Sequence, residues 1–146
     1  MHKGRILIAA LAALLASATV VAEETAARTP APEQARAWIV QPADGAEVPT
    51  TFKVVFGLSG FGVAPAGVDV PNTGHHHLLI DTELENYDAP VPSDANHRHF
   101  GKGQTETMLT LEPGEHTLQL VMGDHLHRPH TPPVTSEVIR ITVVAP

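Results

Sequence analysis

Apolar and polar residues alternate with a period of two along several short segments of the chain. In residues 51–60, Phe52, Val54 and Phe56 fall on one side of an extended backbone, and the residues between them fall on the other. Further runs of strand length occupy residues 37–41, 75–81, 105–111, 115–123 and 136–144. No segment after residue 22 repeats its apolar positions with the helical period, so the pattern predicts strands in this part of the chain.

The segments between these runs are rich in turn-forming residues. Asp44-Gly45 and Pro113-Gly114 favour tight reversals of the backbone. Residues 82–104 form a long irregular segment interrupted by proline and glycine, and the three prolines within residues 124–135 exclude a helix there. Short strands separated by turns predict an all-β fold, a single immunoglobulin-like antiparallel β-sandwich of about six to eight strands.

The first residues have the pattern of a secretory signal peptide. Lys3 and Arg5 precede a long apolar run that ends in small residues. We therefore expect a signal helix over residues 1–22, a flexible leader over 23–36 and the β-sandwich over 37–146. Acidic residues follow the apolar run directly, without a basic flank, so we expect no stable membrane anchor and a periplasmic or secreted location.

Composition narrows the classes of partner. The chain has no cysteine, which excludes a disulfide and a lipid anchor, and its formal net charge is -7 with neutral histidines. Loss of Lys3 and Arg5 with the signal peptide would leave 7 basic against 16 acidic residues, a net charge of -9. This balance repels nucleic acid and anionic membranes and favours cations. We expect no nucleic-acid partner; a metal ion and another periplasmic protein remain as candidates.

Nine of the ten histidines lie between residues 75 and 130, and most of them occur in pairs two residues apart. Residues so spaced on an extended chain point to the same side, about 6.5 to 7 Å apart. Two imidazoles can then converge on one ion through bonds of about 2 Å. Each pair therefore predicts a two-histidine clamp, and we expect at least two clamps to share a surface at one end of the sandwich. The predicted metal ligands are His75, His77, His97, His99, His125, His127 and His130.

Imidazole nitrogen is the dominant donor in this pattern, because thiolates are absent. Copper(II), zinc and nickel suit such donors, and we predict copper(II) or zinc as the bound ion. Acidic residues near the pairs are expected to accept hydrogen bonds from the rings and to orient them. These predicted acceptors are Asp81, Asp94 and Asp124.

Two histidines are predicted to serve the fold instead. His76 is out of phase with its neighbours and shares a face with Leu78 and Ile80, whereas His116 stands alone in phase with Leu118. Two other interpretations of the paired histidines stay open. One is a histidine and carboxylate network that orders the loops, and the other is a solvated surface that titrates near pH 6.5. The second does not explain the paired spacing.

Several longer stretches resemble a known family. They are GVAPAG, TGHHHLLID, HRHFGKGQTE, GEHTLQL and GDHLHRPH, all of which fall between residues 62 and 143. Through these motifs the chain resembles the domain-of-unknown-function 4399 family of small exported bacterial proteins. The resemblance implies a periplasmic β-sandwich without an established activity, and it assigns no metal. Its recurrent positions are the nine histidines of residues 75–130 together with Gly101, Gln104 and Asp124.

The residues favour a periplasmic metal-binding protein that captures, buffers or delivers copper(II) or zinc. One alternative is a copper or zinc metalloenzyme whose ion keeps an open coordination position. Another is an envelope interaction module whose histidine and aspartate network orders its loops. No Ser-His-Asp, Cys-His or paired-carboxylate arrangement stands out, so a binding role is favoured over an enzymatic one and the enzymatic question stays open.

Overall fold

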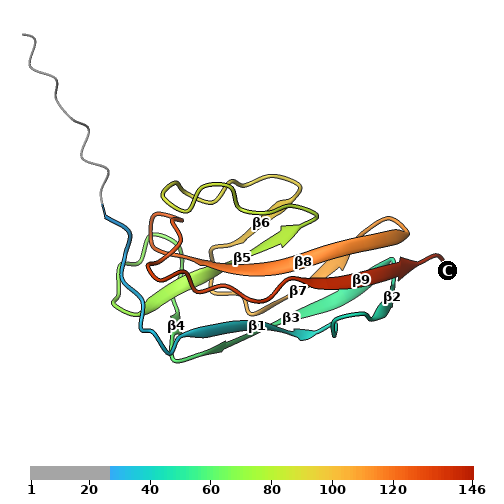
Figure 1. Ribbon diagram of the computed structural model, residues 1–146, viewed down its shortest axis with the longest axis horizontal. Helices are drawn as coiled ribbons and strands as arrows, with labels where there is room; N and C mark the ends of the chain where they lie inside the picture. The colour runs from blue at the N-terminus through green and yellow to red at the C-terminus, as the bar shows by residue number, and fades with distance from the viewer. Residues whose placement is uncertain (1–26) are drawn as a thin grey trace, which may run out of the picture.

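The computed structural model describes residues 27–146, and the predicted signal helix lies outside them. Residues 27–146 form nine strands and no helix, so none is present there that could cross a membrane (Figure 1). In chain order the strands are β1 (Arg36–Gln41), β2 (Glu47–Pro49), β3 (Thr51–Ser59), β4 (Gly62–Val63), β5 (Thr73–Ile80), β6 (His97–Phe100), β7 (Glu106–Thr110), β8 (Gly114–Gly123) and β9 (Ile139–Val144).

The strands form two sheets that pack face to face (Figure 1). The smaller sheet has the order β1-β3-β7, and the larger has the order β2-β9-β8-β5-β4 with β6 also paired to β5. These orders correspond to strands A-B-E and G-F-C of an immunoglobulin-like sandwich, which confirms the predicted fold class. Two details differ from the prediction. The β2–β9 and β4–β5 pairs are parallel, and the very short β2 and β4 raise the number of strands to nine.

The core between the sheets follows the alternation seen in the sequence. Phe52, Val54 and Phe56 of β3 are buried, and Thr51 and Lys53 are exposed, as predicted. Burial of such side chains contributes roughly 1.5 to 3 kcal/mol each. From the larger sheet, the facing core residues are Leu78, Ile80, Leu118, Leu120 and Ile141.

Strand β5 is buried on both of its faces, and this property positions the histidines. His76, Leu78 and Ile80 face the core between the sheets, so their neighbours His75 and His77 face the outer side of the larger sheet. Loops cover that outer side (Figure 1). Leu79, for example, packs there against Leu84 and Val91 of the loop after β5. A strand that is covered on both faces has a continuous run of buried residues instead of an alternation of buried and exposed ones.

Strand β6 was not expected from the sequence, which predicted an irregular segment over residues 82–104. In the structure His97–Phe100 pairs antiparallel with β5, and His99 lies opposite His77. The prediction was wrong because the strand is short and polar. Hydrogen bonds to β5, which is distant in the sequence, stabilise its extended form, and its own residues do not show a strand pattern.

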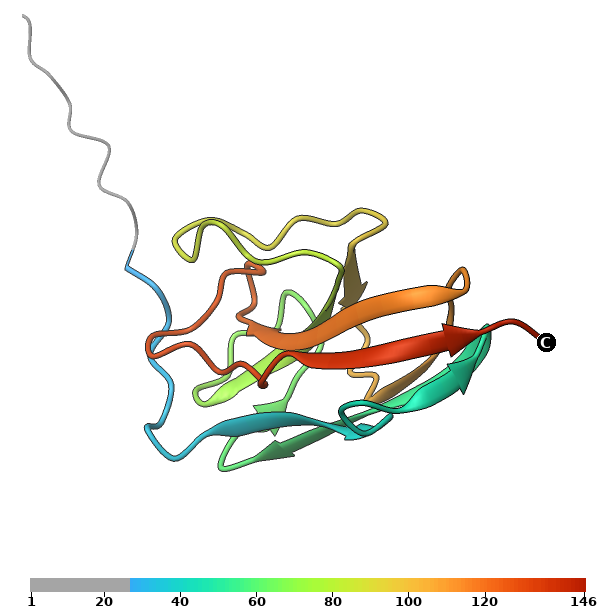
Figure 2. The ribbon, with the colours of Figure 1, turned by 45° about the vertical axis from the view of Figure 1, so that its right-hand side comes forward.

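The segment expected to be a flexible leader is attached to the sandwich over its described part. The Ala31 N–H donates to the Thr131 carbonyl at 3.0 Å, and the Thr131 N–H donates to the Thr29 carbonyl at 2.9 Å. Ala35 is buried, and β1 begins at Arg36. Figure 2 shows this segment running past the loop that follows β8. The ordered domain therefore begins earlier than the predicted residue 37.

Candidate metal centre

Four histidine rings meet on the outer face of the larger sheet, and we call them the four-histidine cluster. Each ring offers one nitrogen, and these nitrogens all lie within 4.8 Å of one another. The ring centroids are 4.7 to 6.0 Å apart. The members of the cluster are His75 and His77 of β5, His99 of β6 and His127 of the loop after β8.

The strand register brings the first three rings together. His75 and His77 are two residues apart on extended backbone and so project to the same side. His99 lies opposite His77 in the antiparallel β5–β6 pair and projects to that side too. Strand β5 lies between β8 and the edge strands, so two of the four rings are held by a strand paired on both sides.

Two glycines leave the space into which the rings lean. Gly123 pairs with His75 in the β5–β8 ladder, and a Cβ atom at Gly123 would lie 2.6 Å from Cε1 of His77. Gly101 directly follows β6, and a Cβ atom there would lie 2.6 Å from Nε2 of His99. Any larger residue would displace these rings. The sequence signal for this role is a glycine beside each histidine motif, in HRHFG and MGDH.

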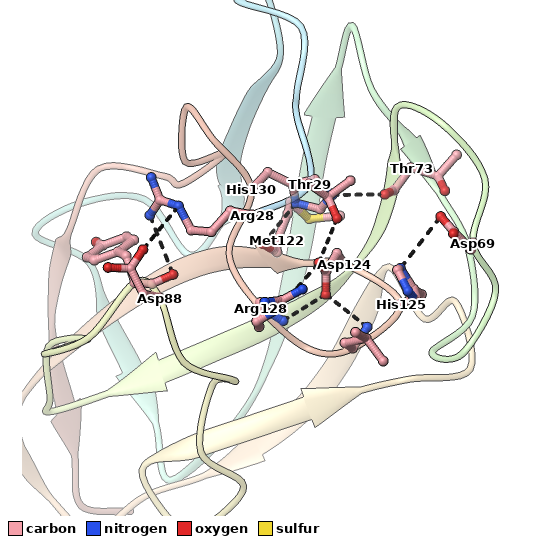
Figure 3. Close-up of polar contacts among 12 residues, drawn as sticks. Arg28, Thr29, Asp69, Thr73, Asp88, Met122, Asp124, His125, Arg128 and His130 are labelled. Atoms are coloured by element: carbon pink, nitrogen blue, oxygen red, sulfur yellow. Dashed lines mark hydrogen bonds and ion pairs between the residues drawn. The ribbon is translucent and has the colours of Figure 1, made fainter. Parts of the chain in front are cut away.

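His127 reaches the cluster from a tight turn that Asp124 holds. The buried Asp124 carboxylate accepts hydrogen bonds from the N–H groups of Leu126 at 2.8 Å and Arg128 at 2.9 Å (Figure 3). The His127 N–H donates to the Asp124 carbonyl at 2.8 Å, and His127 has a φ of 66°. Such left-handed backbone is uncommon outside glycine and is often found at functional sites. The turn brings His127 Nδ1 to 3.0 Å from His75 Nε2.

The distances between the ring nitrogens of the cluster approach those expected between two nitrogens bound to one ion. Two nitrogens on a tetrahedral ion with bonds of 2.0 to 2.1 Å lie about 3.3 Å apart. The His75–His127 separation of 3.0 Å is close to that value, whereas the limit of 4.8 Å exceeds it by about 1.5 Å. At least one ring must therefore turn inward to complete the set. His99 is exposed and His127 is half-buried, so these two rings have the freedom to turn.

Three of the four rings of the cluster, His75, His77 and His99, are held in their neutral form. Burial, followed by the neighbouring His99 and His127 rings, lowers the pKa of His75 to about 4. Burial, followed by His75 and the other two rings, lowers the pKa of His77 to about 3. Burial and the His127 ring lower the pKa of His99 as well. Metal ligands must be unprotonated, so these rings need to lose no proton before they bind an ion at neutral pH.

Two buried ring nitrogens of the cluster have unmet hydrogen-bonding capacity. Nδ1 of His75 and Nδ1 of His77 are buried and lack a hydrogen bond of good geometry. Buried polar atoms in this state are uncommon, and each requires an explanation. In His75 the two ring nitrogens differ: Nε2 faces Nδ1 of His127, and Nδ1 is the buried nitrogen that lacks a partner.

The structure does not bring the other three predicted ligands into the cluster. His97 lies opposite Leu79, two residues further along β5 than His77, and its Nδ1 is 2.9 Å from the Asp94 carboxylate. Nδ1 of His125 is 3.6 Å from the Asp69 carboxylate (Figure 3). His130 is buried, with Nε2 at 3.1 Å from the Thr73 carbonyl. Only the pair on β5 therefore contributes both of its rings to one group.

Of the three predicted aspartate acceptors, Asp94 bonds the ring of a predicted ligand, and the other two contact other groups. Asp81 bonds the ring of His116 at 2.6 Å, and Asp94 bonds the ring of His97. Asp124 shapes the turn that carries His127 through backbone hydrogen bonds, without a bond to a ring of the cluster. None of the three orients a ring of the four-histidine cluster directly. Asp94 is bonded within its own loop, Asp81 is bonded to His116 and Thr117 of β8, and Asp124 is bonded to its own turn and to Thr29.

The two histidines assigned to the fold have that role in the structure. His76 is fully buried, with its ring centroid 4.9 Å from that of Phe56. Nε2 of His116 is 2.9 Å from the Glu112 carbonyl, so both of its ring nitrogens face oxygen atoms. His116 is thus a satisfied polar residue, as the sequence predicted.

A small cavity of about 200 Å³ opens beside the cluster. Three of the four cluster rings line it, together with residues of the loop that follows β5. His75 does not line it. The lining residues are His77, His99, His127, Pro90, Val91 and Ser93.

The fold and the site define an immunoglobulin-like β-sandwich with a four-histidine cluster on the outer face of its larger sheet. Residues 54–144 match the family described as a domain of unknown function, DUF4399, and the chain belongs to this family. This confirms the resemblance seen in the sequence motifs.

Two further comparisons are with solved structures and with curated proteins. Among solved structures, the chain is similar to fibronectin(III)-like modules of Clostridium thermocellum CbhA, with 13% identity and a TM-score of 0.41. The alignment covers 76% of this chain and 47% of that chain, so the match spans about half the length of that protein. A search of curated proteins finds no match.

Proposed function

We propose that this protein is a periplasmic metal-binding protein that holds copper(II) or zinc on His75, His77, His99 and His127. Its role is capture, buffering or delivery of the ion. One observation carries the proposal: four imidazole nitrogens converge within 4.8 Å on a face otherwise covered by loops. The donor set contains nitrogen and neither thiolate nor carboxylate, which suits copper(II) and zinc better than calcium or magnesium. The apolar run behind Lys3 and Arg5 supports export.

The unequal burial of the four rings supports a carrier role. His75 and His77 are fixed and buried on β5, whereas His99 is exposed on an edge strand and His127 lies on a loop. A closed structural zinc site has all its ligands enclosed. Here two ligands can move while two stay, so an ion can enter and leave without unfolding the sandwich.

The test is a metal titration of the mature chain, residues 23–146, purified without a histidine tag. We expect one equivalent of copper(II) or zinc to bind, and elemental analysis of the untreated protein identifies the natural ion. His99→Ala is expected to weaken binding at least tenfold, since loss of a residue that only supports a ligand already costs about 10- to 100-fold. His97→Ala is the matched control, because His97 lies on the same strand, outside the cluster.

Two results would contradict the proposal. One is binding weaker than about 10 μM, which corresponds to less than about 7 kcal/mol of binding free energy. The other is an equal loss of affinity in the His97→Ala and His99→Ala proteins, which would mean that the ion binds elsewhere among the histidines.

A second candidate is an envelope interaction module whose histidine and aspartate network orders its loops. The observation that favours it is that His97–Asp94 and His116–Asp81 already hold their loops without any ion. An ion that binds only the folded protein adds about 2.7 kcal/mol of stability at 100 times its dissociation constant. If copper(II) and zinc leave the unfolding temperature unchanged at such concentrations, the interaction module is the better description.

A further inference from the structure

The cavity beside the four-histidine cluster has the size of a small-molecule site rather than of a cofactor site. Its volume is about 200 Å³. A water molecule occupies about 30 Å³ of liquid volume, and sites for drug-sized ligands measure about 300 to 1,000 Å³. A cavity of about 150 Å³ holds a benzene molecule, so this one accommodates a small ligand of up to about ten heavy atoms. A cofactor or a folded partner segment is too large for it.

The cavity borders the ion site on one side only. His77, His99 and His127 line it, so an ion held among the four rings would lie directly at its edge. The fourth ring, His75, is fully buried and does not line the cavity. An ion in this place has protein nitrogens behind it and beside it, and it has open space toward Pro90, Val91 and Ser93.

The charge of the ion decides which ligands the cavity attracts. The four rings are neutral donors, so a divalent ion among them keeps its full positive charge, and that charge becomes the largest one in the site. Val91 is buried, and Pro90 gives the cavity a second apolar wall. An anion that binds the ion there is attracted through a medium less polar than water, which strengthens the interaction.

We propose that the cavity is a binding site for a small anion, which coordinates the metal ion on the side of Ser93 and takes the place of a bound water molecule. The proposal rests on the metal site proposed above. It gives the protein a second ligand class, small anionic donors of about three or four heavy atoms. Ser93 and Val91 line the cavity and limit the length of the ligand.

The experiment uses sodium azide with the copper(II)-loaded mature chain. Azide bound to copper(II) produces a charge-transfer absorption band, and metal-free protein with azide provides the blank. We expect a saturable band with one azide per copper. Formate is expected to compete with azide. Anthracene-9-carboxylate, which is larger than the cavity, is expected to compete at least about tenfold more weakly, a difference of about 1.4 kcal/mol.

A matched pair of variants locates the anion. Ser93→Phe fills the rim of the cavity and is expected to weaken azide binding at least tenfold, whereas Ser93→Ala leaves the space open and retains azide binding. Copper(II) affinity is expected to be unchanged in both proteins, because Ser93 is not a cluster residue. Circular dichroism shows whether each variant folds, and the series of anion sizes needs no variant.

The outcomes separate this inference from the proposed function. If copper(II) binds but azide produces no saturable band, the anion site is wrong and the metal site stands. Equal competition by formate and anthracene-9-carboxylate, or equal azide affinity in the two Ser93 variants, also overturns the anion site. If copper(II) and zinc do not bind to the cluster at all, both proposals fail together.

Discussion

Two glycines decide how closely the rings of the cluster approach one another. Gly101 has ordinary backbone torsion angles, so alanine fits its backbone, but the added Cβ would overlap the ring of His99. We expect Gly101→Ala to turn this exposed ring away and to lower metal affinity at least tenfold. Stability should change by less than about 1 kcal/mol, because Gly→Ala at a compatible backbone position also reduces the entropy of the unfolded chain. Metal titration and urea unfolding of the same protein measure the two effects.

A double-mutant cycle checks that the effect of Gly101→Ala passes through His99. In a His99→Ala background the ring is absent, so Gly101→Ala should have no further effect on metal affinity. Additive losses in the two backgrounds would contradict the steric explanation and would place the effect of Gly101 in the fold.

His116 carries a pH dependence of its own, separate from the cluster. Burial alone would lower its pKa, but the hydrogen bonds to Asp81 and to the Glu112 carbonyl, with the charge of Asp81, raise the pKa above 6.5. Stabilisation by this pair is complete below pH 6.5 and is lost as the pH rises through the raised pKa. We expect His116→Gln to cost about 0.2 to 1 kcal/mol near pH 6 and less above the raised pKa, the range typical of accessible pairs.

The measurement for His116 is urea unfolding of wild type and His116→Gln at pH 6 and pH 9, with an NMR titration of the ring. A difference in stability that grows from pH 6 to pH 9 would contradict the sign of this prediction. An NMR pKa of the ring below 6.5 would contradict its cause.

At the scale of elements, extended chain and the turn at Asp44-Gly45 were predictable, and the turn that carries His127 was not. The alternation in β3 and the shared side of His75 and His77 both follow from the two-residue period of a strand. The same period predicts that His125 and His127 share a side, but they lie in a turn in which His127 has a positive φ. No local pattern reveals that turn, because a hydrogen-bond acceptor at Asp124 and the close approach of other loops define it.

The register between β5 and β6 is a second feature that the sequence pattern does not predict. His97 and His99 both belong to β6, but only His99 lies opposite His77, and His97 instead bonds Asp94. The choice between them depends on how β6 aligns with β5, two strands separated by a loop. A sequence pattern locates a strand and its faces. The partner of each residue on the neighbouring strand comes from tertiary contacts.

The segment before β1 has a part in the site that its composition did not suggest. The Thr29 hydroxyl donates a hydrogen bond to the Asp124 carboxylate at 2.7 Å (Figure 3). Arg28 lies 3.6 Å from the Asp88 carboxylate, on the loop that also carries Val91 of the cavity wall. The segment therefore joins the loop that bears His127 to the loop that covers the cavity.

Removal of the Thr29 hydroxyl is expected to loosen the turn that carries His127. Burial alone would raise the pKa of Asp124, but the hydrogen bonds of Thr29 and the backbone lower it, so the carboxylate is charged. A hydrogen bond to a charged group contributes about 1.5 to 3 kcal/mol. Thr29→Val should lower stability by that amount and increase amide exchange in residues 124–130. Thr29→Ser keeps the hydroxyl and should behave as wild type; equal exchange in both variants would argue against this role.

For the whole molecule, the buried histidines make the metal-free protein sensitive to acid. The pKa of His76 is lowered to about 4 by burial, and those of His75 and His77 to about 4 and 3. Because the unfolded rings titrate near 6.5, the unfolded chain binds more protons below that pH, and stability is lost as the pH falls from 6.5 toward 4. At pH 5 each ring costs roughly 2 kcal/mol, and the sum for three rings is comparable to the total stability of a domain of this size, about 5 to 15 kcal/mol.

Urea unfolding of EDTA-treated protein at pH 7, 6 and 5 measures this loss directly. We expect stability to be greatest near neutral pH, since His116 loses its contribution above that range and the buried rings lose theirs below it. His76→Leu removes one buried ring outside the proposed ligand set, so it should make the decline between pH 7 and pH 5 shallower. Saturating zinc should raise stability at pH 7 and lose this effect as the pH falls, because protons compete for the same nitrogens. If the stability of the metal-free protein is the same at pH 7 and pH 5, the buried rings can accept protons without unfolding. Burial would then not keep these rings neutral.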